Sequence, residues 1–401
     1  MFDDSVPLDG HAALTIILPS YAVLYLEAAL VQLSGTRLLR LALLPCGLYF
    51  MLQSAKVDQT SMFPDNYKSR LTYFNLGNIT IMLTLAMQLV TFAIAPAPLY
   101  RTDRPRNKFA SIPLPFLLSD AFDLMFNARG IGWNWGTSIP KPTYPTRRAH
   151  AILYSLISFT LHTLLVDAVL SVMYALNPAL RNPEGASMYW VNTGTPLSPL
   201  HTTAITLCMG TIIYAAVVYP YDAVRITALL LGGDPARWPP LFDAPWAATS
   251  LKDLWGRRWH QMFRHSFVVL GAGTGRAVGE PATSSLGRIL AVLGAFTLSS
   301  LLHSLPLHGM GRGGDAFRIS VFFMMMGVGI VLEETWKELT QDVWRRFTGR
   351  FVGGLAGWIW TYAWLLGWGH FLVEAYCQKG IAGALWFRIV TFSLYGIPEH
   401  A

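Results

Sequence analysis

The sequence predicts an all-α, polytopic membrane protein of about eight or nine transmembrane helices with interfacial or re-entrant segments. Hydrophobic residues make up 53% of the 401 residues and charged residues only 13%, whereas charged residues account for roughly 25% of a typical soluble protein. Several apolar stretches reach the ~20 residues that are needed to cross a bilayer. Lipid offers the backbone no hydrogen-bond partner, so these stretches are expected to be helices.

The predicted spans follow one another along the whole chain. In order they are 12–33, 38–54, 71–96, 150–176, 203–220, 286–305, 317–333 and 351–376, with a weaker ninth at 381–397. The acidic N-terminus lacks the basic start of a cleavable signal, so the first span is expected to remain as an anchor. No internal repeat or linker divides the chain. We therefore expect one membrane-embedded domain over 1–401, with two long connections at 97–149 and 233–285.

Basic residues gather in alternate connections and predict the orientation. Segments 97–149 and 221–288 each hold many arginines and lysines, whereas 177–202 holds only Arg181. The positive-inside bias therefore places both basic segments in the cytosol and the N-terminus in the lumen. We expect a multi-pass protein of the endoplasmic reticulum membrane. The formal charge of +7 is spread over separate loops, which excludes a nucleic-acid-binding stripe and favours anionic lipid or a phosphorylated co-substrate as the partner.

The first long connection contains a predicted interfacial helix at 113–126. Its apolar residues recur at helical spacing while two acids occupy other positions: Leu118, Phe122, Met125 and Phe126, against Asp120 and Asp123. Such a pattern is typical of a helix that lies in the membrane surface. The following run, Arg129-Gly-Ile-Gly-Trp-Asn-Trp135, is expected to place its tryptophans in the headgroup layer.

The second long connection contains a run of cations interleaved with aromatic rings. The run is Trp255-Gly-Arg257-Arg258-Trp259-His260-Gln261, followed by Phe263 and Arg264. Arginine can hold phosphate groups while tryptophan stacks on a planar base. An interfacial anchor fits the same residues equally well, because tryptophan and arginine are common at membrane surfaces.

A histidine lies inside the apolar segment 286–305. Phe296, Ser299, Ser300 and His303 stand at i, i+3, i+4 and i+7 and so form one stripe on a helix. An ionisable group in hydrocarbon is costly and usually functional. A buried imidazole is held in the neutral form, which can accept a proton as a general base. The alternative is a histidine that is hydrogen-bonded between helices for packing.

Together these motifs resemble the wax-synthase-like branch of the membrane-bound O-acyltransferases. The matching residues are Pro240–Pro245, Ser250–Asp253, the run 255–261, the F-x-x-S-x-x-x-H pattern at 296–303 and the run 129–135. The resemblance implies transfer of an acyl group from coenzyme A to a hydroxyl without a covalent enzyme intermediate. It places the catalytic histidine at His303 and a second polar residue at His260, for which substrate positioning and proton transfer both stay open.

The resemblance also implies the substrates. The acyl-CoA would be held by His260 and by the neighbouring aromatic and polar residues: Trp255, Arg257, Arg258, Trp259, Gln261 and Arg264. Fungal members of the branch suggest acetyl-CoA as co-substrate, with no permanently bound cofactor and no metal, and a lipophilic alcohol such as a terpenoid or meroterpenoid as acceptor. Plant members suggest the alternative of a long-chain wax ester synthase. A multi-span transporter is the alternative from another class, although the paired repeats common in transporters are missing from the sequence.

Two other patterns suggest chemistry elsewhere in the chain. His162 and Asp167 match the H-x-x-x-x-D pattern of glycerolipid acyltransferases. They lie within a span and no glycine-rich phosphate-binding segment follows, which favours a polar pair between helices. His370 and Glu374 share one helix face. Two ligands are too few for a metal site, which favours packing or a buried hydrogen bond.

Two further sets of residues are interpreted as structural. Glu333 and Glu334 near the end of a span are expected on a solvated helix face. Cys46, Cys208 and Cys377 lie within or at the ends of spans and form no C-x-x-C pair. They therefore suggest neither a disulfide framework nor a zinc site.

Overall fold

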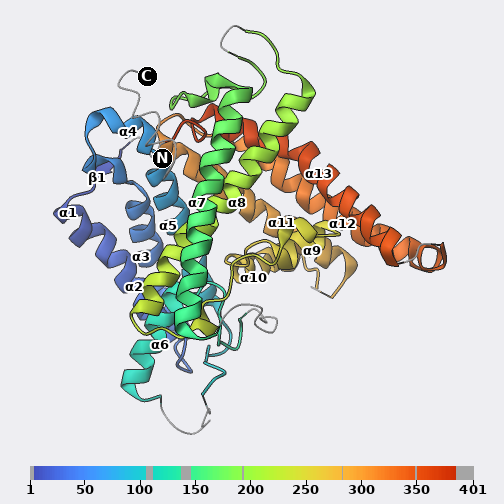
Figure 1. Cartoon of the computed structure of the whole chain (residues 1–401). Helices are drawn as coiled ribbons and strands as arrows, with labels where there is room; N and C mark the ends of the chain where they lie inside the picture. Colours follow the sequence, from blue (N-terminus) through green and yellow to red (C-terminus); the bar gives the residue numbers. More distant parts are fainter. Residues whose placement is uncertain are drawn as a thin grey trace. The chain divides into compact units, whose positions relative to one another are not determined.

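A computed structural model of the protein describes residues 4–104, 112–136, 146–191, 194–281, 283–347 and 350–384 (Figure 1). These residues are mostly helical, which confirms the predicted all-α class. The only strands among them are β1 (Val6–Pro7) and β2 (Val57–Asp58), which pair in parallel. Seven helical segments of the described chain are long and apolar enough to cross a membrane: Gly10–Leu30, Arg37–Ala55, Tyr73–Ile94, Arg148–Leu176, Pro199–Leu230, Ser285–Met310 and Ala316–Thr340. They coincide with the first seven predicted spans.

The two remaining predicted spans differ from these seven. The eighth forms α13 (Arg350–Gln378), a helix of 29 residues. It is not among the seven segments above, although its length would suffice to cross a bilayer. The predicted ninth span, 381–397, lies outside the described residues from position 385 onward.

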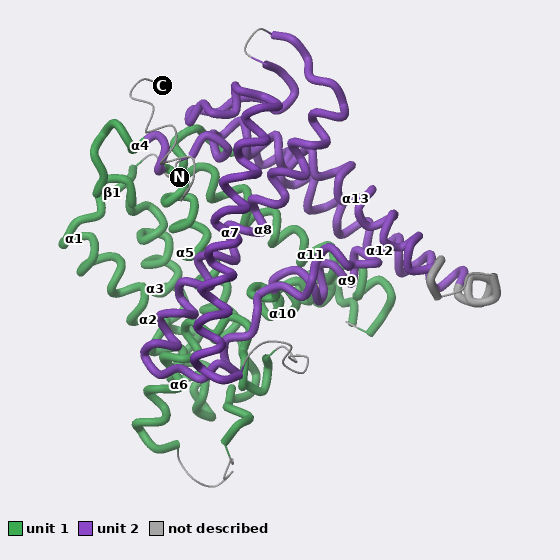
Figure 2. Tube along the Cα trace, in the orientation of Figure 1, with its two compact units in different colours: residues 1–68, 72–138, 261–314 green, residues 69–71, 139–260, 315–401 purple. Residues whose placement is uncertain are grey.

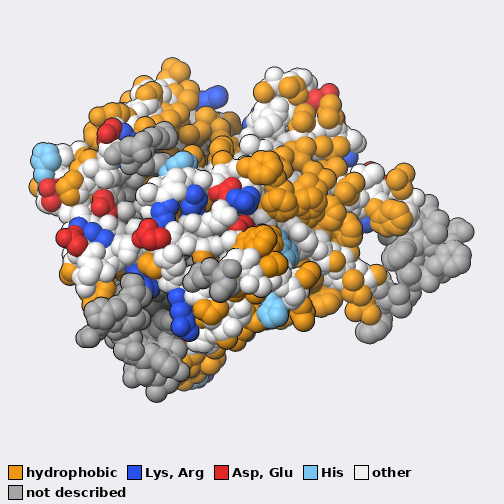
Figure 3. Space-filling model, turned by 90° about the horizontal axis from the view of Figure 1, so that it is seen from above, with side chains coloured by type: hydrophobic (Ala, Val, Ile, Leu, Met, Phe, Trp, Pro, Cys, Tyr) orange, Lys and Arg blue, Asp and Glu red, His pale blue; other side chains and the backbone are white. Residues whose placement is uncertain are grey.

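Apolar side chains cover broad areas of the surface that Figure 3 shows. Large apolar residues within the seven helical segments are among the most exposed, for example Leu38, Leu200 and Phe317. A soluble monomer rarely exposes apolar patches of this extent. The exposed apolar surface is what helices in contact with lipid present.

The chain divides into two compact units, each of which collects segments from distant parts of the sequence (Figure 2). Unit 1 comprises 1–68, 72–138 and 261–314, and unit 2 comprises 69–71, 139–260 and 315–401. Neither unit is continuous in the sequence, so neither could be separated by one cut in the chain. The prediction of a single membrane domain stays a prediction.

Unit 1 is built around four long helices and several short elements. Its helical elements are α1 (Gly10–Ala12), the π-helix η1 (Ala13–Ile17), α2 (Leu18–Leu30), α3 (Arg37–Ala55), the 3-10 helix η2 (Gln59–Met62), α5 (Tyr73–Ile94), α6 (Leu114–Phe126), α10 (Arg264–Ala277), α11 (Ser285–Ser304) and the 3-10 helix η7 (Leu305–Met310). The helix α4 (Asp65–Leu71) begins in this unit. Leu24, Leu89, Phe92 and Leu124 are fully buried in its core.

A buried arginine closes the end of α5. The Arg40 side chain donates to the carbonyl oxygens of Phe92, of Ala93 at 3.4 Å and of Ala95 at 3.0 Å. The last carbonyls of a helix have no partner within the helix, and the negative end of the helix dipole attracts a cation. Arg40 therefore has a structural role at this end of α5.

The predicted helix at 113–126 is present as α6. Three of the four residues of its predicted apolar side face outward, whereas Met125 is buried. Leu118, Phe122 and Phe126 are exposed, whereas Asp120 is buried and accepts a hydrogen bond from Arg104 at 2.8 Å. Because a soluble helix would turn its apolar side inward, this orientation fits a helix whose outer face contacts lipid.

The tryptophans of the run 129–135 do not both face outward. The Trp133 side chain is only 4% exposed, and its indole N–H donates to the Asp123 carboxylate at 2.7 Å. The buried Arg101 also bonds Asp123, at 3.1 Å. The headgroup prediction is therefore wrong for Trp133, because the half-buried Asp123 carboxylate accepts its indole N–H. Trp135 is half-buried and packs on the ring of His265 with centroids 4.3 Å apart.

Unit 2 contains the two longest helical hairpins. Its elements are α7 (Arg148–Leu176), η3 (Pro178–Arg181), α8 (Pro199–Leu230), η4 (Pro235–Arg237), η5 (Pro245–Ala247), α9 (Leu251–Asp253), the π-helix η6 (Leu254–Arg258), α12 (Ala316–Phe347) and α13. Ser198 caps α8 through the backbone N–H of His201, which fits the preference for serine at this position. Leu170, Met173, Ile205 and Met209 form the centre of its core.

Candidate active site

His303 lies near the end of α11 in unit 1 and has a defined orientation. Its Nδ1 atom is 2.7 Å from the carbonyl oxygen of Ser299. A carbonyl oxygen only accepts, so Nδ1 carries the proton and donates it to Ser299. In the neutral imidazole the lone pair then resides on Nε2. The helix therefore presents Nε2 as the basic atom of this side chain.

The predicted stripe on α11 is confirmed as the inward face of the helix. Ser299 and Ser300 are buried and Phe296 is half-buried, whereas Leu301 is exposed. Small residues bring α10 close to α11: a Cβ atom at Gly294 would lie 2.7 Å from the Thr274 side chain. Such close packing between membrane helices holds side chains of the shared face in fixed positions.

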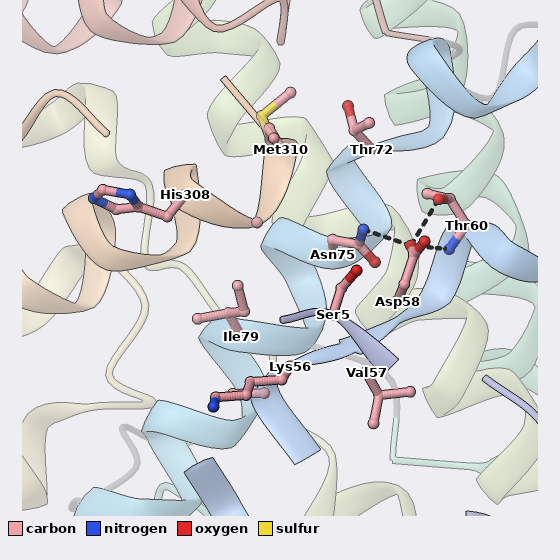
Figure 4. Close-up of a pocket in the computed structure, with 13 residues that line it drawn as sticks. Ser5, Lys56, Val57, Asp58, Thr60, Thr72, Asn75, Ile79, His308 and Met310 are labelled. Atoms are coloured by element: carbon pink, nitrogen blue, oxygen red, sulfur yellow. Dashed lines mark hydrogen bonds between the residues drawn. The ribbon is translucent and has the colours of Figure 1, made fainter. Parts of the chain in front are cut away.

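A cavity of about 230 Å³ with both polar and apolar lining lies within unit 1 (Figure 4). Part of its wall is η7, which directly follows the helix that carries His303. Its lining includes His308 of η7, Lys56 beside β2, and Thr72 and Asn75 at the start of α5. Figure 4 shows these side chains coming from separate parts of the chain. A cavity of this size and polarity can admit a small polar group.

Asp58 holds two other lining residues of this cavity, Thr60 and Asn75, in position through hydrogen bonds. One carboxylate oxygen accepts from the Thr60 N–H at 2.8 Å, the Thr60 hydroxyl at 2.7 Å and the Asn75 amide at 2.7 Å. Burial raises the pKa of Asp58, but these hydrogen bonds outweigh it and hold the pKa below its usual range. The carboxylate is therefore ionised near neutral pH. No local motif in the sequence points to this cluster, because Asp58 and Asn75 come from different elements.

The run 255–260 lies in unit 2 and surrounds His260 with aromatic rings. The Trp255 and Trp259 rings have centroids 5.6 Å apart. Phe242 packs edge-on against Trp259 at 5.0 Å and against His260 at 5.7 Å. His260 and its aromatic neighbours thus form one half-buried cluster, as expected of either a binding surface or an anchor.

The two arginines of this run bond acidic and carbonyl groups of the same connection. Arg257 donates to Asp253 at 2.8 Å and to Asp243 at 2.8 Å. Arg258 donates to the other oxygen of Asp253 at 2.5 Å and to the Ala244 carbonyl at 3.1 Å. Asp253 is in turn placed by Ser250, whose hydroxyl accepts the Asp253 N–H. These bonds fold the connection, and the predicted role of both arginines in holding acyl-CoA stays a prediction.

Acidification is expected to weaken this fold, because Asp253 must be ionised to hold both arginines. Burial raises the pKa of Asp253, but the bonds from Arg257 and Arg258 outweigh it and lower the pKa below its usual value. A lowered folded-state pKa stabilises the protein above the unfolded value of about 3.9, and this stabilisation is lost as the pH falls below that value. Asp253→Asn should lose about 1–3 kcal/mol at pH 7, and Arg257, which is 53% exposed, contributes the smaller share.

The measurement for Asp253 is thermal unfolding of the purified wild type and Asp253→Asn between pH 7 and pH 3. The difference in melting temperature should be largest at pH 7 and shrink below about pH 4. Asp65→Asn is the matched control, because Asp65 pairs with Lys68 at an exposed position and such pairs contribute little. A difference that is independent of pH would contradict the role of the carboxylate charge.

A buried carboxylate on α12 bonds the short helix α9, which precedes the run. Glu333 is 7% exposed and accepts the backbone N–H groups of Leu251 at 2.6 Å and Lys252 at 3.2 Å. The indole N–H of Trp360 on α13 donates to it at 2.9 Å. The prediction of a solvated face is therefore wrong for Glu333, because its oxygens are used by backbone donors about 80 residues away in the chain.

The helix α13 contacts the same connection at further points. Trp358 donates to the Trp246 carbonyl at 2.9 Å and Tyr362 donates to the Pro245 carbonyl. A Cβ atom at Gly357 would lie 2.3 Å from the Thr249 carbonyl oxygen, so only glycine permits this approach. The hairpin of α12 and α13 thus positions the segment that leads into the run.

The remaining predicted site residues belong to unit 1. Gln261 is half-buried and Arg264 is exposed at the first position of α10. The structure therefore gathers Trp255, Arg257, Arg258, Trp259 and His260 in unit 2, and assigns Gln261, Arg264 and His303 to unit 1.

The competing patterns resolve into structural contacts. The Nε2 atom of His162 on α7 lies 3.4 Å from the Tyr214 hydroxyl on α8, so this hydrogen bond joins two helices. Its Nδ1 atom donates to the Ser158 carbonyl. Its partners therefore differ from the predicted Asp167. Glu374 accepts from the Ser187 hydroxyl and the Met188 N–H, each at 2.8 Å, as expected of a buried hydrogen bond. Among the described residues no cluster of three or more His, Cys, Asp or Glu could hold a metal ion.

Comparison with known proteins supports the resemblance. Residues 238–325 match the "Membrane bound O-acyl transferase family", and this segment contains both the run 255–261 and His303. Over this segment the chain is similar to that family. The candidate catalytic histidine, His303, lies within the matched residues.

Three relatives are similar over part of the chain. The chain is 27% identical to "O-Mevalon transferase yanI" of Aspergillus niger over 52% of its own length and 49% of that protein. It is 29% identical to "Acetyltransferase spyB" of Aspergillus fumigatus over 38% and 28%. It is 30% identical to "Probable long-chain-alcohol O-fatty-acyltransferase 8" of Arabidopsis thaliana over 36% and 40%. The chain thus spans about half or less of the length of the curated relatives it matches.

Proposed function

We propose that the protein is a membrane O-acyltransferase that transfers an acetyl group from acetyl-CoA to a hydroxyl of a lipophilic acceptor, such as a terpenoid or meroterpenoid. The orientation of His303 carries this proposal. Its Nδ1 proton is committed to Ser299, which leaves Nε2 as the proton acceptor, and it lies inside the segment that matches an acyltransferase family. We place the reaction in the endoplasmic reticulum membrane.

The proposed step is a direct transfer. His303 Nε2 takes the proton of the acceptor hydroxyl as the hydroxyl oxygen attacks the thioester carbonyl. The new C–O bond forms, the C–S bond breaks, and the coenzyme A thiolate recovers the proton from the imidazolium. Proton transfer by a positioned side chain contributes about 10²- to 10⁴-fold to the rate. His260 and its aromatic neighbours are proposed to position the acyl-CoA.

The acceptor is proposed to lie with its polar group near the end of α11. The cavity whose polar lining includes His308, Thr72 and Asn75 lies beside the η7 segment, which directly follows this helix. An acceptor with one hydroxyl and a bulky apolar body would suit a protein whose outer surface contacts lipid. The similarity to the fungal acetyltransferase spyB supports acetyl as the acyl group.

The two acyl chain lengths are distinguished by supplying both donors. Membranes that contain the protein are incubated with acetyl-CoA or palmitoyl-CoA and with a panel of terpenoid alcohols and fatty alcohols. We expect acetyl esters of a terpenoid alcohol at a rate at least tenfold above palmitoyl esters. Preference for palmitoyl-CoA and a fatty alcohol would establish the wax ester alternative, which the plant relative supports. Uptake of a substrate with no ester from either donor would favour the transporter.

A further inference from the structure

We propose that unit 1 contains a phosphate-binding cavity in which Arg37 and Arg276 supply the positive charge. The inference deepens the proposed function, because the phosphates of coenzyme A are one source of this ligand chemistry and the headgroup phosphate of an anionic lipid is the other. It also assigns phosphate binding to residues other than those of the run 255–261 and Arg264, which the sequence predicts to hold acyl-CoA.

The cavity has a volume of about 490 Å³, which falls within the size range of small-molecule sites. It lies between the start of α3, the end of α5 and one side of α10. Arg37 comes from α3, Thr91 and Ile94 from α5, and His265 and Arg276 from α10. The lining holds two arginines and no carboxylate, so its net charge favours an anion.

Neither arginine has an acidic partner among the described residues. Two other arginines of unit 1, Arg101 and Arg104, bond aspartates. Arg276 uses one N–H to bond the Val269 carbonyl at 3.2 Å, which holds the guanidinium along α10. A guanidinium has five donors in a planar fork that matches phosphate oxygens. Most of these donors therefore stay available to a ligand.

The other polar groups of the cavity are suited to an uncharged part of the ligand. Burial lowers the pKa of His265, and the charge of Arg264 lowers it further, so the imidazole is neutral at pH 7. Its ring packs on Trp135, which fixes it in place. Ile94, Leu99 and Val269 supply apolar lining. A ligand that carries a phosphate on an apolar or planar group would contact the arginines with its phosphate and the apolar lining with the rest.

The position of the cavity along α5 agrees with a cytosolic ligand. It lies where α5 ends and the basic connection 97–149 begins, and the charge bias of the sequence assigns this connection to the cytosol. The paired arginines Arg257 and Arg258 already use carboxylate and carbonyl partners. Arg37 and Arg276 would bind a phosphate without first breaking an ion pair, which lowers the cost of binding.

The test measures binding directly, so that it does not depend on ester formation. The full-length protein is purified into nanodiscs of phosphatidylcholine alone. Titration calorimetry then compares coenzyme A with pantetheine, which lacks the phosphates, for the wild type, Arg37→Gln, Arg276→Gln and the double variant. Arg288→Gln is the matched control, because Arg288 is exposed on α11 and bonds only local groups.

If the ligand is coenzyme A, each single variant should weaken its binding about tenfold, which corresponds to about 1.4 kcal/mol, and leave pantetheine binding unchanged. If the ligand is a lipid, coenzyme A binding should stay unchanged. In that case the wild type and Arg288→Gln should retain phosphatidylinositol through purification, whereas the double variant should not. Unchanged coenzyme A binding together with unchanged lipid retention would overturn the proposal.

The wild type also separates this proposal from the proposed function. Coenzyme A binding that depends on Arg37 and Arg276, without ester formation, would refute the acyltransferase activity and leave the cavity assigned. If the double variant forms ester with a normal KM for acetyl-CoA and its retained lipid is unchanged, the acyltransferase activity is supported and the phosphate-binding cavity is refuted. Melting temperatures equal to that of the wild type show that the variants are folded.

Discussion

Replacing His303 with alanine is expected to reduce ester formation about 10²- to 10⁴-fold, the range that a positioned general base contributes. The loss should appear in kcat, because the imidazole acts on the proton of the hydroxyl and not on the binding of acyl-CoA. The assay measures ester product in membranes at saturating donor, normalised to the amount of folded protein. His303→Gln is included because its amide has similar reach and cannot act as a base.

The chain contains its own control for this experiment. His162 lies within another span and bonds the carbonyl of the serine four residues earlier, Ser158, at 2.7 Å, as His303 bonds Ser299 at 2.7 Å. Both histidines thus have the same tautomer and the same local geometry. His162→Ala should keep activity within about threefold of the wild type. Equal losses from both variants would mean that embedded histidines stabilise the bundle, and activity at wild-type level in His303→Ala would refute its role as the base.

The sequence predicts well those features that depend on neighbouring residues. Apolar stretches locate seven spans because each helix satisfies its own backbone hydrogen bonds. The stripe at 296–303 is correctly read as one helix face, since the residues are three and four apart. The same reasoning identifies α6, although it does not foresee that Asp120 lies inward beside Arg104.

Features that depend on distant partners are not visible in the sequence. Trp133 is buried because Asp123 and Arg101 meet it in three dimensions. Arg257 is paired because Asp243, 14 residues earlier, folds back onto it. The cavity between α3, α5 and α10 joins segments that are more than 200 positions apart. A local pattern can propose which residue types bind phosphate, but only the fold shows which of them lack an acidic partner.

Glu333→Gln is expected to be the most damaging change outside α11. The carboxylate accepts two backbone N–H groups and one indole N–H, and it can do so because it has acceptor atoms only. The glutamine amide would turn an NH₂ group toward at least one of these donors. Leaving a buried donor without its acceptor costs about 1–3 kcal/mol, so we expect a lower melting temperature and loss of the position of α9.

Glu334→Gln separates this effect from a change of surface charge. Glu334 is the neighbouring acid and pairs with Lys252 and Lys337 at exposed positions, so its loss should cost less than about 1 kcal/mol. If Glu333 positions the run 255–260, Glu333→Asp should recover part of the activity, and KM for acyl-CoA should change more than kcat. If kcat and the melting temperature both fall while KM is unchanged, Glu333 only stabilises the packing of the helices. The two outcomes differ because a carboxylate that holds a binding segment acts on the substrate through that segment, whereas one that only joins helices does not.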